Sequence, residues 1–220
     1  MEDKELQAFQ TMSAFLVHDL KNTVSTLSLM VQNITTHFGD PAFREDCLRG
    51  LSRSVAHMND LIRRLTLLRQ ELELKRAETD LNEVLASAMA DLAGARGVTW
   101  VKDLQAVPKI QADPEQLRKV FANLLLNARE AVNDAGEVRV STAQENGWVT
   151  ATVSDNGCGM SPEFMRRSLF RPFQTTKKTG LGIGMFQSRA IVEAHQGRIE
   201  VESQPGKGTT FRVLLPLETS

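Results

Sequence analysis

The sequence predicts an α+β protein in which an antiparallel helical hairpin is followed by a mixed α/β sandwich. Two long segments carry apolar residues spaced by threes and fours, the pattern of one stripe on an α-helix. Gly39-Asp40-Pro41 interrupts this pattern between the two segments. From about Glu78 onward, short β-prone runs alternate with helical segments. We therefore place the boundary near residues 76–80, with one domain at 1–77 and the other at 78–220.

The first domain is expected to contain two helices of roughly 35 residues, each about 50 Å long. The second of them spans about residues 42–77. The apolar stripe of the first helix contains Met12, Leu16, Leu20, Val24, Leu27, Val31, Ile34 and Phe38. The short loop between the helices makes them antiparallel. Because a lone hairpin buries little apolar surface, we expect two copies to form a dimeric four-helix bundle.

Local signals also predict the elements of the second domain. Asp113-Pro114 is typical of a helix start, with Asp as the N-cap and Pro at the first helical position. Asn146-Gly147 is typical of a tight hairpin turn. The expected helices span residues 81–93, 114–133 and 185–195, and the expected strands span 98–101, 137–142, 148–154, 198–203 and 209–215.

Composition and charge argue against several classes of partner. Of the 220 residues, 41% are hydrophobic and 24% are charged, which is ordinary for a soluble globular protein. A formal net charge of −1 gives no bulk attraction to nucleic acid or anionic lipid, so neither is expected as a partner. The two cysteines, Cys47 and Cys158, have neither metal nor disulfide spacing and are expected to be reduced thiols.

The sequence contains no apolar run of about 18 residues that would cross a membrane. Its N-terminal segment lacks the apolar stretch of a signal peptide, and the helical pattern begins almost at residue 1. We therefore expect a cytoplasmic chain that is a fragment of a longer protein, or whose sensing part lies elsewhere. Any membrane attachment is expected through a segment outside this chain.

The first candidate site is His18-Asp19-Leu20-Lys21-Asn22. His18 lies about 200° around the helix from Leu16, opposite the apolar stripe, and is therefore expected to face solvent. Asn22 follows one turn later on the same face. Asp19 is placed to accept a proton from one imidazole nitrogen, which makes the other nitrogen a better nucleophile. Taken alone, such a histidine is more often an ordinary surface residue on a polar helix face.

A second candidate site is the pair Asn123 and Asn127 on the helix that begins after Asp113. Two amides at this spacing point the same way. Their carbonyl oxygens suit a hard cation such as Mg²⁺ bound to phosphates. The alternative, a polar strip beside the apolar face of the helix, has equal weight on this evidence alone.

Glycine-rich segments form the remaining candidate sites. Asp155, Gly157 and Gly159 directly follow a strand, where backbone can approach a flat ligand and a carboxylate can accept from an exocyclic amine. The alternative is a plain Asp-Asn-Gly turn. Gly180, Gly182 and Gly184 open a helix, whose exposed N–H groups suit phosphate, although their spacing is a weak signal. Gly206–Phe211 is most simply a hairpin turn.

In their joint order, these motifs resemble the H, N, G1, F, G2 and G3 boxes of sensor histidine kinases. The matching residues are His18 in the H box, Asn123 and Asn127 in the N box, Asp155, Gly157 and Gly159 in G1, Leu169–Phe173 with Thr175-Thr176-Lys177 in the F box and ATP lid, and Gly180, Gly182 and Gly184 in G2. The resemblance covers essentially the whole chain. The His-Asp-x-Lys-Asn form is most similar to the nitrogen-regulation branch, and Phe173–Phe186 also resembles kinases linked to exosortase (PEP-CTERM) systems.

This resemblance implies a homodimer built on the hairpin, followed by an ATP-binding domain of the Hsp90/gyrase/histidine-kinase type. It implies that Asp155 holds adenine and that Asn127 and Asn123 hold Mg²⁺. His18 would attack the γ-phosphate of ATP, with Asp19 as base, and the phosphoryl group would pass to an aspartate of a response-regulator receiver domain. The resemblance also implies phosphatase activity toward that regulator, with a role for Asn22.

The chain departs from the family pattern at three points. Thr23 stands where many H boxes have proline, Glu130 stands where many N boxes have lysine, and the lid is short. Lys177 is therefore expected to meet phosphate charge. Two alternatives remain: a hydrolytic ATPase of the same superfamily, which would carry Glu in place of Asn123, and a degenerate kinase that serves as a dimeric scaffold.

Overall fold

The computed structural model describes residues 2–69, 73–90, 92, 97–132, 136–172, 174–175 and 182–217, apart from the side chains of 2–18, 35 and 60–69. The chain divides into two units, Met1–Glu71 and Leu72–Ser220, so the division precedes the expected boundary by a few residues. The reason is that the Lys75 backbone N–H donates to the Asp113 carboxylate and that Ala77 pairs with Ala112. These contacts tie the segment before residue 78 to the second unit.

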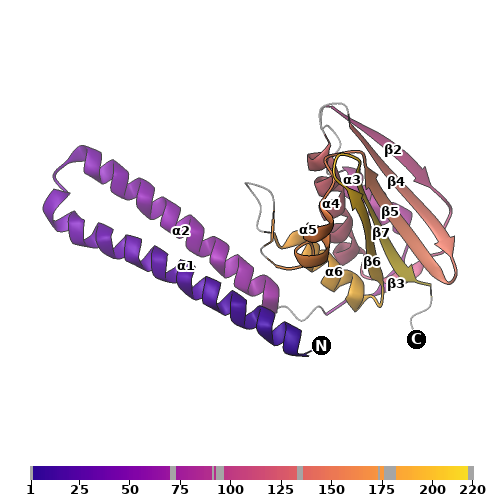
Figure 1. The fold of residues 1–220 in the computed structure, drawn as a ribbon, viewed down its shortest axis with the longest axis horizontal. Helices are drawn as coiled ribbons and strands as arrows, with labels where there is room; N and C mark the ends of the chain where they lie inside the picture. The colour runs from indigo at the N-terminus through magenta and orange to yellow at the C-terminus, as the bar shows by residue number, and fades with distance from the viewer. Residues whose placement is uncertain are drawn as a thin grey trace. The chain divides into compact units, whose positions relative to one another are not determined.

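The first unit is the expected antiparallel hairpin of α1 (Glu2–His37) and α2 (Pro41–Arg69), drawn in indigo to purple in Figure 1. Asp40 immediately precedes α2 and caps its first turn, because the Asp40 carboxylate accepts the Ala42 backbone N–H at 2.9 Å. The expectation that this helix continues to residue 77 is wrong. Residues 73–76 are not helical, and strand pairing takes over at Ala77. No helix among the described residues combines the length and apolarity needed to span a bilayer.

The buried side chains of the hairpin are small. Among the side chains that the structure describes in this unit, Thr23, Cys47 and Ser54 are buried, while Leu27 and Ile34 of the predicted apolar stripe are half-buried. A Cβ on Gly50 would lie 2.0 Å from Met30 Cε, so the end of the Met30 side chain packs directly over this glycine. The large apolar residues left exposed on the single hairpin include Leu20, Val24, Val31, Leu48 and Val55. The stripe therefore remains available to another surface.

The second unit is built on a five-stranded sheet of order β2-β4-β5-β7-β6. Its strands are β2 (Val98–Leu104), β4 (Gly136–Glu145), β5 (Trp148–Asp155), β6 (Arg198–Gln204) and β7 (Gly208–Pro216). The β2–β4 pair is parallel and the other pairs are antiparallel. The β4–β5 turn is at Asn146-Gly147, both with positive φ, which confirms the hairpin that these two residues predict.

Three helices cover one face of this sheet: α3 (Leu81–Ala90), α4 (Pro114–Ala131) and α6 (Gly184–Ala194), as Figure 1 shows. The core between them contains fully buried side chains such as Phe121, Leu124 and Val153. The structure adds three short elements that the sequence did not predict. These are a two-stranded sheet of β1 (Ala77–Thr79) with β3 (Ile110–Ala112), and helix α5 (Pro162–Arg167).

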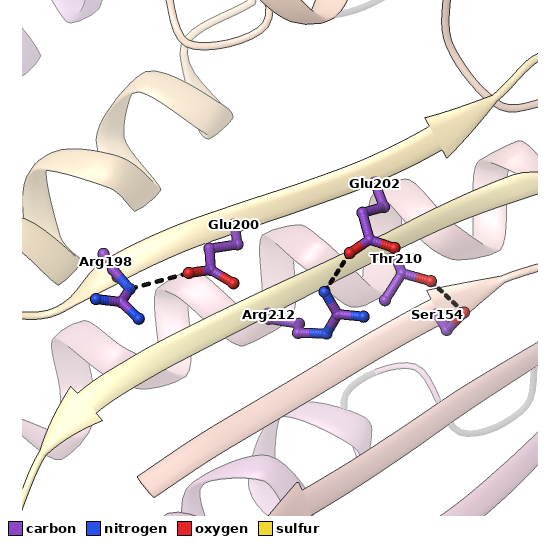
Figure 2. Close-up of polar contacts among 6 residues, drawn as sticks. All are labelled: Ser154, Arg198, Glu200, Glu202, Thr210 and Arg212. Carbon is purple, nitrogen blue, oxygen red and sulfur yellow. Dashed lines mark hydrogen bonds and ion pairs between the residues drawn. The ribbon is translucent and has the colours of Figure 1, made fainter. Parts of the chain in front are cut away.

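Polar side chains line the sheet face opposite the helices. Figure 2 shows Ser154 and Thr210 in contact across β5 and β7, with 2.8 Å between their hydroxyl oxygens. On the same face, Arg212 pairs with Glu202, which lowers the pKa of that carboxyl group through a hydrogen bond and charge attraction. Residues along the strands thus alternate between a buried apolar face and a solvated polar face of the sheet, as expected of a two-layer sandwich.

Candidate active site

Helix α4 positions the two asparagines of the second motif. Asp113 caps the helix, because its Oδ1 accepts the backbone N–H groups of Glu115 and Gln116, each at 3.0 Å. Leu117, Phe121, Leu124 and Leu125 point into the core and orient the helix about its axis. Asn123 and Asn127, one turn apart, therefore lie half-buried at the edge of the core.

Helix α6 brings Gly184, the last glycine of the Gly180–Gly184 motif, against these asparagines. Asn123 Nδ2 donates to Ser188 Oγ at 3.0 Å. Both amides also donate to the Met185 sulfur, which lies 3.6 Å from Asn123 Nδ2 and 3.4 Å from Asn127 Nδ2. A Cβ on Gly184 would lie 2.3 Å from Asn123 Oδ1, so only glycine fits at this point of α6. The structure thus joins two motifs that lie more than fifty residues apart in the chain.

Asp155 is the last residue of β5 and is buried, with 8% of its surface exposed. Burial raises the pKa of this carboxyl group, although hydrogen bonds from the backbone N–H groups of Gly157 and Thr209 oppose the shift. Gly157 N–H donates to Asp155 Oδ1 at 2.9 Å. The other carboxylate oxygen is Oδ2, an acceptor with the chemistry needed for an exocyclic amine.

The two glycines after Asp155 are required by close packing. A Cβ on Gly157 would lie 2.3 Å from the Ala131 carbonyl oxygen at the end of α4, and the Cys158 N–H donates to that same oxygen at 2.9 Å. Gly159 has φ +65°, and a Cβ there would lie 2.0 Å from the Gln204 carbonyl oxygen. Asn123, Asn127 and Ala131 are spaced by four residues, so one face of α4 connects the α6 contacts with the Asp155 loop.

The glycine-rich segment 206–211 forms the β6–β7 hairpin turn, as expected, and it also supports the Asp155 loop. A Cβ on Gly208 would lie 1.9 Å from the Asp155 carbonyl oxygen. Ser203 Oγ accepts the Met160 N–H at 2.8 Å and contacts Thr209 Oγ1 at 2.9 Å. A cavity of about 600 Å³ opens here, lined by Asp155, Met165, Ser203, Lys207, Thr209 and neighbouring residues.

Sequence reasoning missed four residues of this region: Met185, Ser188, Ser203 and Thr209. Thr209 stands in the quoted Gly-Lys-Gly-Thr-Thr-Phe segment and was treated only as part of a turn. Met185 directly follows the third glycine of its motif, a position that gave a usable signal. Ser188 and Ser203 carry no local signal, because their roles arise from contacts with residues distant in sequence.

The His18 motif lies in the first unit, and the other candidate residues lie in the second. His18 is within α1, but its side chain is outside the described part of the structure. Asp19 Oδ2 is 3.9 Å from His57 Nε2 on α2, and Thr23 Oγ1 donates to the Asp19 carbonyl oxygen at 2.9 Å. Asn22 is exposed, as expected.

Four predicted residues of the lid and of the Gly180–Gly184 motif lie outside the described residues: Phe173, Thr176, Lys177 and Gly180. Gly182 is described and has φ +64°, the left-handed conformation that favours glycine. Gly182 and Gly184 thus have the geometry expected of a glycine motif that opens a helix.

The second unit is similar to known proteins in both sequence and fold. Residues 112–219 match the family of histidine kinase-, DNA gyrase B- and HSP90-like ATPases. We therefore call Leu72–Ser220 the ATPase-like domain. Its fold is similar to the catalytic domain of histidine kinase ThkA, with a TM-score of 0.59 and 25% identity over 65% of this chain and 96% of that one.

The whole chain is similar to sensor histidine kinases. It is 30% identical to sensor histidine kinase ZraS of Klebsiella oxytoca, over 97% of this chain and 47% of that protein. It is also 30% identical to histidine-protein kinase AtoS of Escherichia coli, over 97% of this chain and 36% of that protein. The chain thus spans about half the length, or less, of these relatives.

Two larger structures share the fold. One is ShkA in complex with AMPPNP, with a TM-score of 0.63 and 23% identity over 96% of this chain and 46% of that one. The other is ThkA in complex with the response regulator TrrA, with a TM-score of 0.68 and 20% identity over 98% of this chain and 64% of that one. The fold likeness to both structures therefore extends beyond the ATPase-like domain.

Proposed function

We propose that this chain is the catalytic core of a sensor histidine kinase, which binds Mg²⁺-ATP, phosphorylates its own His18 and transfers the phosphoryl group to an aspartate of a response-regulator receiver domain. The observation that carries the proposal is the convergence of three motifs on α4. Asn123 and Asn127 contact the start of α6, and Ala131 at the end of the same helix holds the Asp155 loop. The similarity to sensor histidine kinases supports the same assignment.

In this proposal, Asp155 accepts a hydrogen bond from the exocyclic amine of adenine. The carboxylate is buried, accepts the Gly157 N–H and lines the cavity together with Gly208. The fold likeness to ShkA, solved in complex with AMPPNP, supports a nucleotide as the ligand. Gly180, Gly182 and Gly184 would present N–H groups to the phosphates, and Lys177 would add positive charge.

The donor set at α4 also fits Mg²⁺. Asn123 and Asn127 each offer a hard carbonyl oxygen, and Mg²⁺ in nucleotide sites is commonly held by one or two protein ligands together with phosphate oxygens. Among the described residues there is no group of three His, Cys, Asp or Glu that would bind a metal without phosphates. When bound, Mg²⁺ would neutralise charge that develops on the phosphates.

The phosphoryl transfer itself uses the first unit. A nitrogen of the His18 imidazole forms a bond to the γ-phosphorus while the bond from that phosphorus to the β,γ-bridging oxygen breaks, and ADP leaves. Asp19 takes the imidazole proton. The catalytic contribution of the protein is then mainly positioning and charge stabilisation. The ThkA–TrrA complex supports a receiver domain as the next acceptor of the phosphoryl group.

We also propose that the hairpin forms a homodimer and that the kinase removes phosphate from its regulator with the help of Asn22. The exposed apolar stripe supports the dimer, since burying it in a four-helix bundle would remove it from water. The His18-to-Asn22 sequence is most similar to the nitrogen-regulation branch, and Phe173–Phe186 resembles the group linked to exosortase systems. Membrane attachment would come from a segment outside this chain.

Incubation with γ-labelled ATP tests the proposal. We expect label on the protein that is labile in acid and stable in base, as a phosphoramidate is, and that disappears in His18→Gln. His37→Gln, on the same helix, is the matched control and should keep its label. Release of free phosphate without labelled protein would favour a hydrolytic ATPase instead. Neither product would favour a scaffold, and label that persists in His18→Gln would contradict the assignment of the nucleophile.

A further inference from the structure

We propose that Met185 and Ser188 are positioning residues that orient the amide of Asn123, so that its carbonyl oxygen is directed to Mg²⁺. This inference rests on the proposed function and adds to it two residues of α6. The contacts of the Asn123 amide use its NH₂ group and end on α6. An amide held by its NH₂ group can offer its oxygen to another partner.

The Met185 sulfur determines which end of each amide faces α6. It lies 3.4 Å from Asn127 Nδ2 and 3.6 Å from Asn123 Nδ2. A thioether accepts weak hydrogen bonds but has no hydrogen to donate. If either amide were reversed, its oxygen would face the sulfur, and two acceptors would meet. One side chain therefore favours the same orientation in both asparagines.

Ser188 adds a stronger contact to one of the two amides. Its hydroxyl oxygen accepts from Asn123 Nδ2 at 3.0 Å, and the serine has only 2% of its surface exposed. Water has little access to this buried hydroxyl and cannot readily replace the Asn123 amide as its donor. Losing the bond would therefore leave a polar group unsatisfied. The Ser188 contact thus fixes Asn123 in the orientation that Met185 favours.

The Asn123 oxygen faces the beginning of α6. A Cβ on Gly184 would lie 2.3 Å from Asn123 Oδ1 and 3.0 Å from Nδ2, so the oxygen is the nearer atom. The start of a helix is where backbone N–H groups favour phosphate. An oxygen held beside this point is suitably placed for a cation that bridges to phosphates, whereas an NH₂ group there would repel the cation.

The test compares nucleotide affinity with and without Mg²⁺. Calorimetry measures ADP binding to the full chain, as wild type, Met185→Leu, Ser188→Ala and the double variant. Met185→Leu conserves volume and removes the acceptor. We expect each single variant to lose about 2- to 10-fold of the affinity gained with Mg²⁺, from the net worth of one hydrogen bond. Affinity without Mg²⁺ should change less than about twofold.

Controls separate orientation from packing. Met89→Leu makes the same change in the core on α3, at 7% exposure, and should keep the full Mg²⁺-dependent gain. Asn123→Ala combined with Ser188→Ala should lose no more than Asn123→Ala alone, because the serine acts through that amide. Ser188→Thr, which restores a hydroxyl, should recover part of the gain.

Two failures are distinguishable. If the wild type binds ADP without any gain from Mg²⁺, the proposed magnesium role fails, and this inference fails with it. If the wild type shows the gain and Met185→Leu with Ser188→Ala keeps all of it, the positioning role alone is wrong. Should the double variant lose its fold, the volume-conserving Met185→Leu decides by itself, since equal Mg²⁺ dependence there would overturn the inference.

Discussion

The His195 imidazole accepts a hydrogen bond from the backbone N–H of Asp113, with 2.9 Å between the Asp113 nitrogen and Nε2. Nδ1 of the same ring lies 2.7 Å from the Ile191 carbonyl oxygen. Because Nε2 accepts, the proton of the neutral ring is on Nδ1, which donates to that carbonyl. His195 therefore joins the end of α6 to the cap of α4, the two helices that hold the candidate site.

This arrangement predicts a loss of stability at mildly acidic pH. Burial is the main reason why the pKa of His195 is lowered. In mildly acidic solution, the unfolded chain therefore binds a proton at this residue more readily than the folded chain does. Stability from this residue is present above the unfolded pKa of about 6.5 and falls as the pH drops from there to the folded pKa. The slope is at most about 1.4 kcal/mol per pH unit.

Urea unfolding followed by tryptophan fluorescence measures this effect. Both tryptophans, Trp100 and Trp148, lie in the ATPase-like domain, and His195 is its single histidine. We expect the free energy of unfolding to fall between pH 6.5 and 5 in wild type. In His195→Gln it should be lower at pH 7.5 and fall less over that interval. The same slope in both proteins would show that His195 is not the responsible group.

A second prediction concerns Asp155. Asp155→Ala should weaken binding of both ATP and ADP, because the adenine amine loses its acceptor. A hydrogen bond to a charged group is worth roughly 1.5–3 kcal/mol, so we expect a loss of about 10- to 150-fold by calorimetry. Asp103→Ala is the matched control, since Asp103 is an exposed residue of β2. Unchanged affinity in a folded Asp155→Ala protein would exclude the adenine role.

A third prediction concerns dimerisation. Val31 and Leu48 are each 65% exposed on the single hairpin, so a second copy is expected to cover them. Val31→Glu with Leu48→Glu should convert the dimer to a monomer, because the bundle would bury two unpaired charges per chain. Light scattering measures the mass, and Ser52→Glu at an exposed polar position of α2 is the control. A stable wild-type monomer at micromolar concentration would contradict the bundle.

A fourth prediction concerns removal of phosphate from the regulator. Asn22 is exposed one turn after His18, and an amide can donate and accept hydrogen bonds at once, which suits it to orient a water molecule. Asn22→Ala should keep most autophosphorylation and transfer but slow dephosphorylation of the cognate regulator at least about tenfold, or roughly 1.4 kcal/mol of barrier.

The matched control for this experiment is Asn33→Ala, which removes another exposed amide from the same helix. Decay of the phosphorylated regulator is timed with each variant after the cognate regulator has been identified. If Asn22→Ala accelerates the decay as much as wild type does, the role of Asn22 is wrong. If wild type never accelerates the decay, the protein is a kinase without phosphatase activity.

Short-range signals in the sequence determined much of this protein. The Asp113-Pro114 cap, the Asn146-Gly147 turn and the break at Gly39–Pro41 each act within a few residues, through backbone hydrogen bonds and allowed dihedral angles. The order of the motifs could also be recognised, because the spacing of glycines and asparagines along the chain is a property of the sequence itself. These signals were sufficient to predict the hairpin and the five strands of the main sheet.

Only the tertiary structure decided which of these residues meet. The parallel pairing of β2 with β4, the addition of β1 to β3, and the contact of Met185 and Ser188 with the asparagines all join segments far apart in the chain. Such contacts depend on how buried faces pack together, and no local pattern encodes the partner. The same holds in the hairpin, where Thr23 and Cys47 are buried while apolar residues such as Val31 and Leu48 stay exposed.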